Sequence, residues 1–571
     1  MADREGDIEA GTRGAKEDSA GGVVQLTDAQ GRLTMKRGIF RRGLLAVGSA
    51  ALIVLAGSPS LGQAPKTGGV LSLRLREDLP QGFAINESPT ISTMWPAMPC
   101  FSNLVLFDPA KPTHSADTII GELAERWAWE ENYRKLVLAL RGDVTWHDGR
   151  PFSATDVKYT LDVLREAPDA PAKLRTNPRH EWYVNVDRVE AVDPRTVVIR
   201  LKRPQPSFLL MLASGFTPIY AAHVPAASYR TGCIGTGPFK VKEWRKGEFV
   251  EYVKNPSYFV KGRPYLDGLR YLIIAERSTA MAALQTGRVD VAFPGETPKP
   301  IAEQLKKGTP QLVSTSVNTS VIDLLMINTR KPPFDDVKVR EAVNRAVDRR
   351  SVVKAVYQGG AVLGAGMLPR PYGFWGLVEG DLSSLAGYGR PDDEKAKARA
   401  LLGAAGFGPA RPLKVEMLTR GLPAFTDLAS FVVGELKRVG IDATLRQVES
   451  SQWFPLQTRG EFHIGTDRNG MEPDDPDAVF YESFGCKSPR NYSGYCSEEL
   501  TRLIDQQSQE LDAQKRLALV LEIQRKIEQA AVRPVLVWRL DYFTTWPHVK
   551  GLVPHHSIYG WGRMQDVWRD K

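Results

Sequence analysis

The chain has 571 residues, of which 42% are hydrophobic and 25% are charged. These proportions are ordinary for a globular protein, and they argue against a disordered chain and against a protein with many membrane spans. The formal net charge is +9, but the basic residues are spread along the chain and form no dense block after Arg42. Nucleic-acid binding is therefore not predicted.

Residues 35–64 have the pattern of an export signal. A basic segment precedes an apolar run at residues 44–56, and small residues end the stretch as in a cleavage site of the A-x-A type. The arginine pair at 41–42 favours the twin-arginine route, with the general secretory route and an uncleaved membrane anchor as alternatives. Residues 1–34 are polar and lack hydrophobic periodicity, so we expect either a disordered extension or a true start at Met35. The sequence therefore predicts an exported protein.

The first well-defined elements lie around residue 150. Leucines alternate with other residues over 136–140, which predicts a buried strand, and Asp-Gly at 148–149 predicts a tight turn. A helix should follow, with Ser153 or Thr155 as its cap and with apolar residues at spacings of four and three on one face.

Strands and helices continue to alternate, which predicts an α/β fold. The clearest unit is a strand at 412–418, an amphipathic helix at 425–439 and a second strand at 441–448. Such a β-α-β unit favours a parallel sheet with a ligand crevice at the carboxyl ends of its strands. Residues 498–531 predict a helical pair or one bent helix, which Pro534 ends.

Export changes the interpretation of the four cysteines. Cys486 and Cys496 are separated by a polar, turn-rich loop, and an oxidising compartment would allow them to form a disulfide. Cys100 and Cys233 are candidates for a second bridge, although the sequence does not choose among the three connectivities. A zinc site is a weaker alternative, because no CxxC pair is present and the eight histidines are scattered.

Several segments resemble one protein family. LRGDVTWHDGRPFSATDV at 140–157 is similar to the signature (L/V)R-x-(D/G)-V-x-(F/W)-HDG-x-P-(F/L)-(S/T)-A-x-DV of the bacterial solute-binding proteins of family 5. These are the dipeptide- and oligopeptide-binding receptors of ABC importers. GTGPF at 235–239, AALQTGRVDV at 282–291 and PPFDDVKVREAVNRAVDRRSVV at 332–353 look like further landmarks of that family, in the family's order.

The resemblance implies an α/β protein of the type II-like periplasmic-binding class, in its large peptide-binder subtype, with a hinge between two lobes. We expect residues 65–280 to form lobe 1 with the family's extra subdomain, residues 281–534 to form lobe 2, and residues 535–571 to return to lobe 1. Such a receptor is a periplasmic monomer that delivers its solute to a permease and ATPase complex in the inner membrane. Catalysis, a cofactor and a bound metal are not expected.

The resemblance also implies where a solute binds. In peptide-binding relatives the first Asp of the pattern W-x-x-D-(Y/N)-x-(D/E)-P binds the α-amino group of the peptide. Aligned on Asp475 and the proline after it, that Asp falls on Glu472 and the Trp falls on Asn469. Glu472 is thus the expected amine ligand, with a solvated acidic turn as the alternative. An Arg that contacts the ligand carboxylate in some relatives falls on Thr466, with Arg468 close by.

Aromatic and histidine side chains give weaker indications. Trp375 and Trp453 lie in loop-like contexts where relatives place the walls of the cleft, and core packing is the alternative for both. His463, His555 and His556 are candidates for a metal or haem ligand, but neighbours on a strand point to opposite faces.

Short peptides are the expected solute of such a receptor. Nickel, opines and sugars are the alternatives, because other members of the family take them up. A secreted hydrolase is the alternative of another class, although no GxSxG elbow, HExxH helix or complete GxGxxG loop is present.

Overall fold

The computed structural model describes residues 64–369 and 373–570. Of the predicted export signal it describes only Ala64, so that prediction and the predicted extension at residues 1–34 lie outside the described residues. Within the described part of the chain, no helix is both long and apolar enough to cross a membrane.

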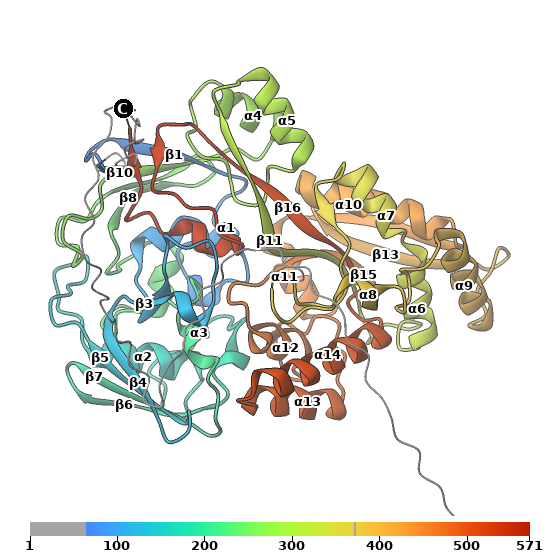
Figure 1. The fold of residues 1–571 in the computed structure, drawn as a ribbon, viewed down its shortest axis with the longest axis horizontal. Helices are drawn as coiled ribbons and strands as arrows, with labels where there is room; N and C mark the ends of the chain where they lie inside the picture. Colours follow the sequence, from blue (N-terminus) through green and yellow to red (C-terminus); the bar gives the residue numbers. More distant parts are fainter. Residues whose placement is uncertain (1–63, 370–372, 571) are drawn as a thin grey trace, which may run out of the picture. The chain divides into compact units, whose positions relative to one another are not determined.

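Residues 70–273 of the first lobe form two four-stranded sheets and a two-stranded one (Figure 1, left). One sheet has the order β1-β10-β9-β8, in which β1 and β10 are parallel and the other pairs are antiparallel. The other has the order β4-β5-β7-β6 and is antiparallel throughout. The strands are β1 (Val70–Leu75), β2 (Val105–Phe107), β3 (Ile119–Gly121), β4 (Ala124–Glu130), β5 (Lys135–Leu140), β6 (Val186–Asp193), β7 (Thr196–Leu201), β8 (Phe239–Arg245), β9 (Phe249–Lys254) and β10 (Gly268–Ile273).

The predicted strand, turn and helix near residue 150 are confirmed. Strand β5 is followed by a turn with Gly149 at φ +89°, and then by helix α2 (Ala154–Leu164). Ser153 is the N-cap of α2, and its backbone N–H donates to the carboxylate of Asp156 over 2.9 Å. The other helices of this lobe are α1 (Ile91–Ala97) and α3 (Phe208–Leu212).

The second lobe is built on a six-stranded mixed sheet with the order β12-β16-β11-β15-β13-β14 (Figure 1, right). Strand β13 is parallel to β14 and to β15, so the predicted β-α-β unit is confirmed, with helix α10 as its crossover. The strands are β11 (Val313–Ile327), β12 (Ala361–Val362), β13 (Leu413–Arg420), β14 (Ile441–Val448), β15 (Ile464–Gly470) and β16 (Val535–Thr545).

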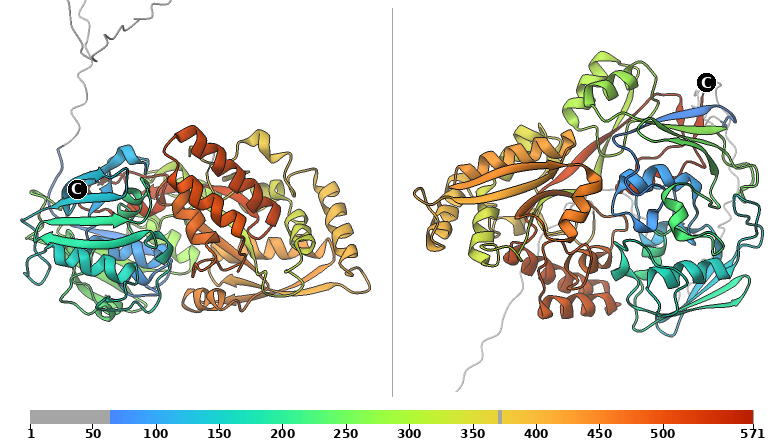
Figure 2. Two further views of the ribbon diagram at one scale, coloured as in Figure 1. Left: turned by 90° about the horizontal axis from the view of Figure 1, so that it is seen from below. Right: turned by 180° about the vertical axis from the view of Figure 1, so that it is seen from behind.

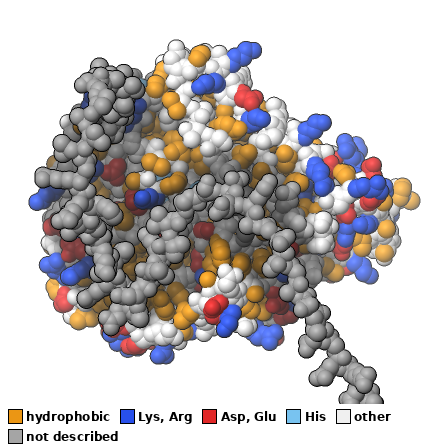
Figure 3. Space-filling view, viewed as in Figure 1, with side chains coloured by type: hydrophobic (Ala, Val, Ile, Leu, Met, Phe, Trp, Pro, Cys, Tyr) orange, Lys and Arg blue, Asp and Glu red, His pale blue; other side chains and the backbone are white. Residues whose placement is uncertain are grey.

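Helices cover this sheet and extend beyond it. Residues 498–531 form two helices, α13 and α14, which lie side by side in the views of Figures 1 and 2 and end before Pro534. On the face shown in Figure 3, basic and acidic side chains are interspersed at the right-hand end, over α6 and α9. The helices are α6 (Val337–Ala346), α7 (Arg349–Ser351), α8 (Glu379–Leu382), α9 (Pro391–Ala404), α10 (Pro423–Lys437), α11 (Ser450–Thr458), α12 (Pro476–Phe484), α13 (Glu498–Gln509) and α14 (Ala513–Ala530).

Two long paired strands, β11 and β16, carry the chain between the lobes. Their antiparallel register shifts between Asn318 and Ile322, and helices α4 (Arg277–Gln285) and α5 (Lys299–Gly308) lie near the crossing. The sequence predicts that residues 535–571 return to the first lobe. Residues 535–545 form β16, which is a strand of the six-stranded sheet of the second lobe, so the path back to the first lobe runs through that sheet. The residues after Thr545 then form β17 (Val549–Lys550), η7 (Ile558–Gly562) and β18 (Trp568–Arg569), and Met564 and Val567 join the core around Leu71 and Leu73.

Two disulfides are present. Cys486 is bonded to Cys496, the pairing that the sequence favours, and Cys100 is bonded to Cys233. The second bridge joins residues that are 133 positions apart in the sequence. Cys100 follows α1, and Cys233 precedes β8.

Candidate ligand-binding cleft

The cleft is built where the parallel strands of the second lobe end. Leu418 of β13 pairs with Gly465 of β15, so two residues further on Arg420 and Asp467 come side by side. The Thr466 hydroxyl donates to the hydroxyl of Thr419 over 2.8 Å and ties the two strand ends together. Carboxyl ends of strands are where open α/β sheets usually bind ligands.

Three pockets adjoin one another here, and the inner one is lined by residues at these strand ends. The inner pocket has a volume of about 30 Å³, and residues of both lobes line it, among them Arg76, Thr90, Asp467 and Tyr559. The middle pocket has about 640 Å³ and shares Pro89, Phe454 and Arg490 with the inner one. The outer pocket has about 340 Å³ and shares Pro80, Gln81, Arg175 and Ser451 with the middle one.

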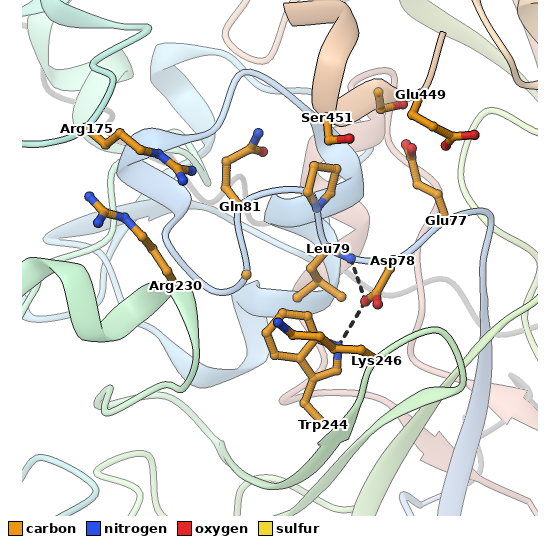
Figure 4. Close-up of a pocket in the computed structure, with 13 residues that line it drawn as sticks. Glu77, Asp78, Leu79, Gln81, Arg175, Arg230, Trp244, Lys246, Glu449 and Ser451 are labelled. Carbon is orange, nitrogen blue, oxygen red and sulfur yellow. Dashed lines mark hydrogen bonds between the residues drawn. The ribbon is translucent and has the colours of Figure 1, made fainter. Parts of the chain in front are cut away.

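The pockets differ in what they could hold. Pockets of roughly 300 to 1,000 Å³ suit small organic ligands, so the middle pocket has the volume of a ligand site. The inner pocket has room for only about two water molecules. In the outer pocket, Arg175 and Arg230 lie on one side while Glu77 and Glu449 lie on the opposite side (Figure 4).

Ion pairs join the two lobes across the cleft. The Arg420 guanidinium lies 2.7 Å from Glu77, a residue that follows β1, and it also donates to the Ser450 hydroxyl over 2.6 Å. Burial lowers the pKa of Arg420 to about 10. Burial alone would raise the pKa of Glu77, but the nearby charges of Arg420 and Arg76 bring it below its ordinary value. Because this pair is buried, removal of either partner would leave an uncompensated charge in the cleft.

A second group of ion pairs centres on Glu296, in the segment between the lobes. Its carboxylate lies 2.9 Å from Arg76 of the first lobe and 3.5 Å from Arg468 of β15. Burial would raise the pKa of Glu296, but Arg76 and Arg468 lower it to about 2. Glu296 therefore stays ionised and links the two lobes over the whole physiological pH range.

Asp467 differs from these paired acids. Its side chain lines the inner pocket and the residue is only 7% exposed. One carboxylate oxygen accepts a hydrogen bond from the backbone N–H of Arg468 over 2.7 Å. Burial raises the pKa of Asp467 to about 6, despite the nearby Arg533, Arg490 and Arg420.

Glu472, the amine ligand expected from the sequence, lies elsewhere. It is buried against the first lobe, where the Ser214 hydroxyl and the Gly215 N–H donate to its carboxylate, the latter over 2.7 Å. Burial raises the pKa of Glu472. Because both oxygens already accept hydrogen bonds and the residue does not line any of the three pockets described here, its role as amine ligand stays a prediction.

Asp475 has contacts typical of a structural residue. It is the N-cap of α12 and accepts a hydrogen bond from the Asp477 N–H over 3.0 Å. Its two oxygens also accept a bidentate pair of hydrogen bonds from Arg516, each 2.8 Å long. Asn469 is buried within β15, where it pairs with Ile322 of β11.

The two predicted tryptophans do not line these pockets either. Trp453 is completely buried in the core of the second lobe, with the Arg420 guanidinium 5.8 Å from its ring. The Trp375 indole donates to the carbonyl of Asp474 over 3.1 Å, and Arg516 lies over its ring. Ligand contacts of these residues stay predictions, and the neighbour Phe454 takes the wall position instead.

The residues at and near the position of the relatives' carboxylate-binding Arg also have partners. Thr466 is hydrogen-bonded to Thr419, and Arg468 lies 2.9 Å from Asp323. Sequence reasoning missed Arg420 and Asp467. A signal was present for Arg420, which follows the predicted strand at 412–418 of the parallel sheet, whereas the strand that contains Asp467 was not predicted.

Two lobes joined by paired strands, with a charged and largely closed cleft between them, define a solute-binding protein. The sequence profile described as bacterial extracellular solute-binding proteins, family 5 Middle, matches residues 118–491. The chain belongs to this family, whose members are exported solute receptors of ABC importers and not enzymes.

Relatives match over most of the chain. The probable di/tripeptide-binding protein 5 of Pseudomonas aeruginosa is 27% identical over 522 residues, covering 86% of this chain and 95% of that protein. The dipeptide-binding protein of Escherichia coli is 27% identical over 466 residues, covering 76% and 84%. The solved structure of the periplasmic binding protein DppA from Helicobacter pylori, in complex with the peptide STSA, has a TM-score of 0.78 at 23% identity and covers 89% of this chain and 99% of that one. This likeness supports the two-lobed α/β fold.

Proposed function

We propose that this chain is the periplasmic receptor of an ABC importer and that its solute is a short peptide. The middle pocket carries the proposal, since it has the volume of a small ligand and adjoins a buried, charged inner pocket at the carboxyl ends of β13 and β15. The names of the relatives from Pseudomonas aeruginosa and Escherichia coli, di/tripeptide- and dipeptide-binding proteins, support the same class of solute.

The remaining parts of the proposal follow from this role. The pattern at residues 35–64 supports export by a cleavable signal. The receptor works as a monomer, performs no catalysis, and delivers its solute to a permease and ATPase complex. Solute contacts that exist only in the closed state drive closure, because a ligand that binds both states equally shifts no population.

Thermal melting of the purified protein, freed of bound solute by unfolding and refolding, tests the proposal. The panel contains dipeptides, longer peptides, opines, oligosaccharides and nickel. A ligand at 100 times its dissociation constant adds about 2.7 kcal/mol to the stability, which gives a clear rise in melting temperature. Peptides should give this rise. A rise with another class only, or no rise with any compound, contradicts the peptide proposal.

A matched pair of variants checks the location. Ser451 lies where the middle and outer pockets meet, so Ser451→Trp should fill that junction and abolish the rise. Gln452, the next residue of the same helix, is exposed and lines neither pocket, so Gln452→Trp should keep the rise. Equal responses of the two variants would place the solute elsewhere.

A further inference from the structure

The lining of the middle pocket is rich in proline. Five of its sixteen residues are prolines, whereas the whole chain has 39 prolines among 571 residues. They come from both lobes and are Pro80, Pro89, Pro178, Pro455 and Pro489. A proline has a fixed φ angle and no backbone N–H, so each of these positions offers a solute a rigid apolar ring and no backbone donor. This lining therefore favours apolar contact over main-chain hydrogen bonding.

Two aromatic rings add to the apolar surface. Phe454 and Tyr492 both line the middle pocket, and both pack edge-on against Trp453. The ring centroid of Trp453 lies 4.9 Å from that of Phe454 and 6.5 Å from that of Tyr492. Because Trp453 is completely buried in the core of the second lobe, this packing limits the motion of both rings.

The charged residues of the lining have partners in the protein. Four charged residues belong to it, and each lies within 4.0 Å of an opposite charge. The pairs are Arg175 and Arg230 with Glu87, Arg459 with Glu461, and Arg490 with Glu482. The side chain of Arg175 is 53% exposed, so water and salt screen its charge. A charged side chain of the solute would thus gain little in this pocket.

Most polar side chains of the lining are also engaged. Thr176 donates to a backbone carbonyl over 2.9 Å, Thr458 donates to another over 3.1 Å, and Asn177 donates to a third over 2.8 Å. A pocket fixes its ligand through the polar groups that remain available and through apolar contact. Here the lining leaves mainly apolar contact for the solute.

We propose that the middle pocket selects peptides that carry an aromatic side chain, and that this side chain lies against the prolines and Phe454. The inference rests on the function proposed above and narrows its class of solute. Aromatic rings bury a large apolar area and gain further from edge-on contact with other rings. The pocket has a volume of about 640 Å³ and rigid walls, so a small side chain would leave part of it without contacts.

The first test measures, by calorimetry, the affinities of tripeptides in which one residue varies in an alanine background. The varied residue is alanine, leucine, phenylalanine, tryptophan, glutamate or lysine, placed at each of the three positions in turn. At one position, phenylalanine and tryptophan should bind at least tenfold more tightly than alanine, because they bury more apolar surface. Leucine should lie between them, and glutamate and lysine should bind no more tightly than alanine.

The outcomes of this series separate the inference from the proposed function. Affinities that stay within threefold at every position overturn the aromatic selectivity while the peptide receptor stands. Tightest binding of the leucine, glutamate or lysine peptides overturns it as well. Binding of none of the tripeptides overturns the proposed function itself.

The second test removes one ring of the lining. Phe454→Ala should reduce the preference for phenylalanine over alanine at least fivefold and leave the affinity for trialanine within threefold of wild type. Phe431→Ala is the matched control, because Phe431 is a partly buried ring that packs on another core cluster and lines none of the three pockets. It should keep the full preference. An unchanged preference in Phe454→Ala, or an equal loss for every peptide, overturns the inference.

A third test leaves the core untouched. Thr458 is exposed at the end of α11 and lines the middle pocket, whereas Gln452 is exposed on the same helix and lines none of the three pockets. Thr458→Glu should weaken the phenylalanine peptide at least fivefold, since the new carboxylate loses water when a ring enters. Gln452→Glu should stay within twofold of wild type. Equal effects of the two variants overturn the placement of the aromatic side chain.

Discussion

Lowering the pH from 7 to 5 should weaken binding of an amine-bearing solute about tenfold. Burial raises the pKa of Asp467 to about 6, so the carboxylate is about nine-tenths ionised at pH 7 and about one-tenth ionised at pH 5. Only the ionised form pairs with an ammonium group, and that pairing lowers the pKa of Asp467 in the complex. Affinity is therefore nearly full at pH 7, is about halved at pH 6, and falls about tenfold for each pH unit well below pH 6.

Other charged groups around Asp467 do not titrate in this range. Burial lowers the pKa values of Arg420 and Arg533 to about 10, and Arg490 keeps a pKa above its ordinary value. Burial also raises the pKa of Asp474 to about 6, but Asp474 lies beside Phe374 and not in the lining of the three pockets.

Calorimetry at pH 5, 6 and 7 gives the required comparison. Two buffers with different ionisation enthalpies report proton release, and near pH 6 about half a proton should leave for each solute bound. Asp467→Asn should remove both the proton release and the loss of affinity at low pH. Wild-type affinity that is constant between pH 5 and 7, or a pH dependence that persists unchanged in Asp467→Asn, would refute the reasoning.

Three further predictions concern stability, each measured by urea unfolding. Replacing Cys100 and Cys233 by serine should cost about 5 kcal/mol, because their bond closes a loop of 133 residues in the unfolded chain; a cost below about 1 kcal/mol would contradict the loop-entropy estimate. Asp475→Ala should cost about 3 to 5 kcal/mol, since it leaves Arg516 buried without its bidentate partner; a neutral variant would show that water replaces the pair. Trp453→Ala should cost about 3 to 5 kcal/mol, as expected for a completely buried ring; a change in solute affinity without loss of stability would restore Trp453 to the cleft wall.

Much of the fold follows from local patterns in the sequence. The turn at Gly149 and the cap at Ser153 have residue types that fit only a few backbone conformations, and the structure has both. The parallel pairing of β13 and β14 follows from the helix between them, because a short crossover leaves few other arrangements. The place of β16 does not follow in this way. Its hydrogen bonds run to β11, more than 200 residues earlier, and no local pattern specifies such a partner.

The site was harder to predict than the fold. An acidic cluster around Glu472 suggested ligand binding, but the structure uses Asp475 to cap a helix and Glu472 to contact Ser214 and Gly215. Whether a carboxylate is paired depends on distant residues, as Arg420 and Glu77 show. Asp467 lies inside β15, a strand outside those predicted, and its burial in the inner pocket is visible only in three dimensions.

The path of the chain sets an order in which the lobes can fold. Met564 and Val567 belong to the same core as Leu71 and Leu73, whereas the sheet of the second lobe is complete once β16 has been made. On the ribosome, the first part of the protein to be synthesised would therefore be among the last to reach its final packing. Until residues near 567 are available, the apolar face beneath β1 lacks part of its cover and is open to chaperones and proteases. A deletion of only these few residues should thus damage the beginning of the protein more than the segment next to the cut.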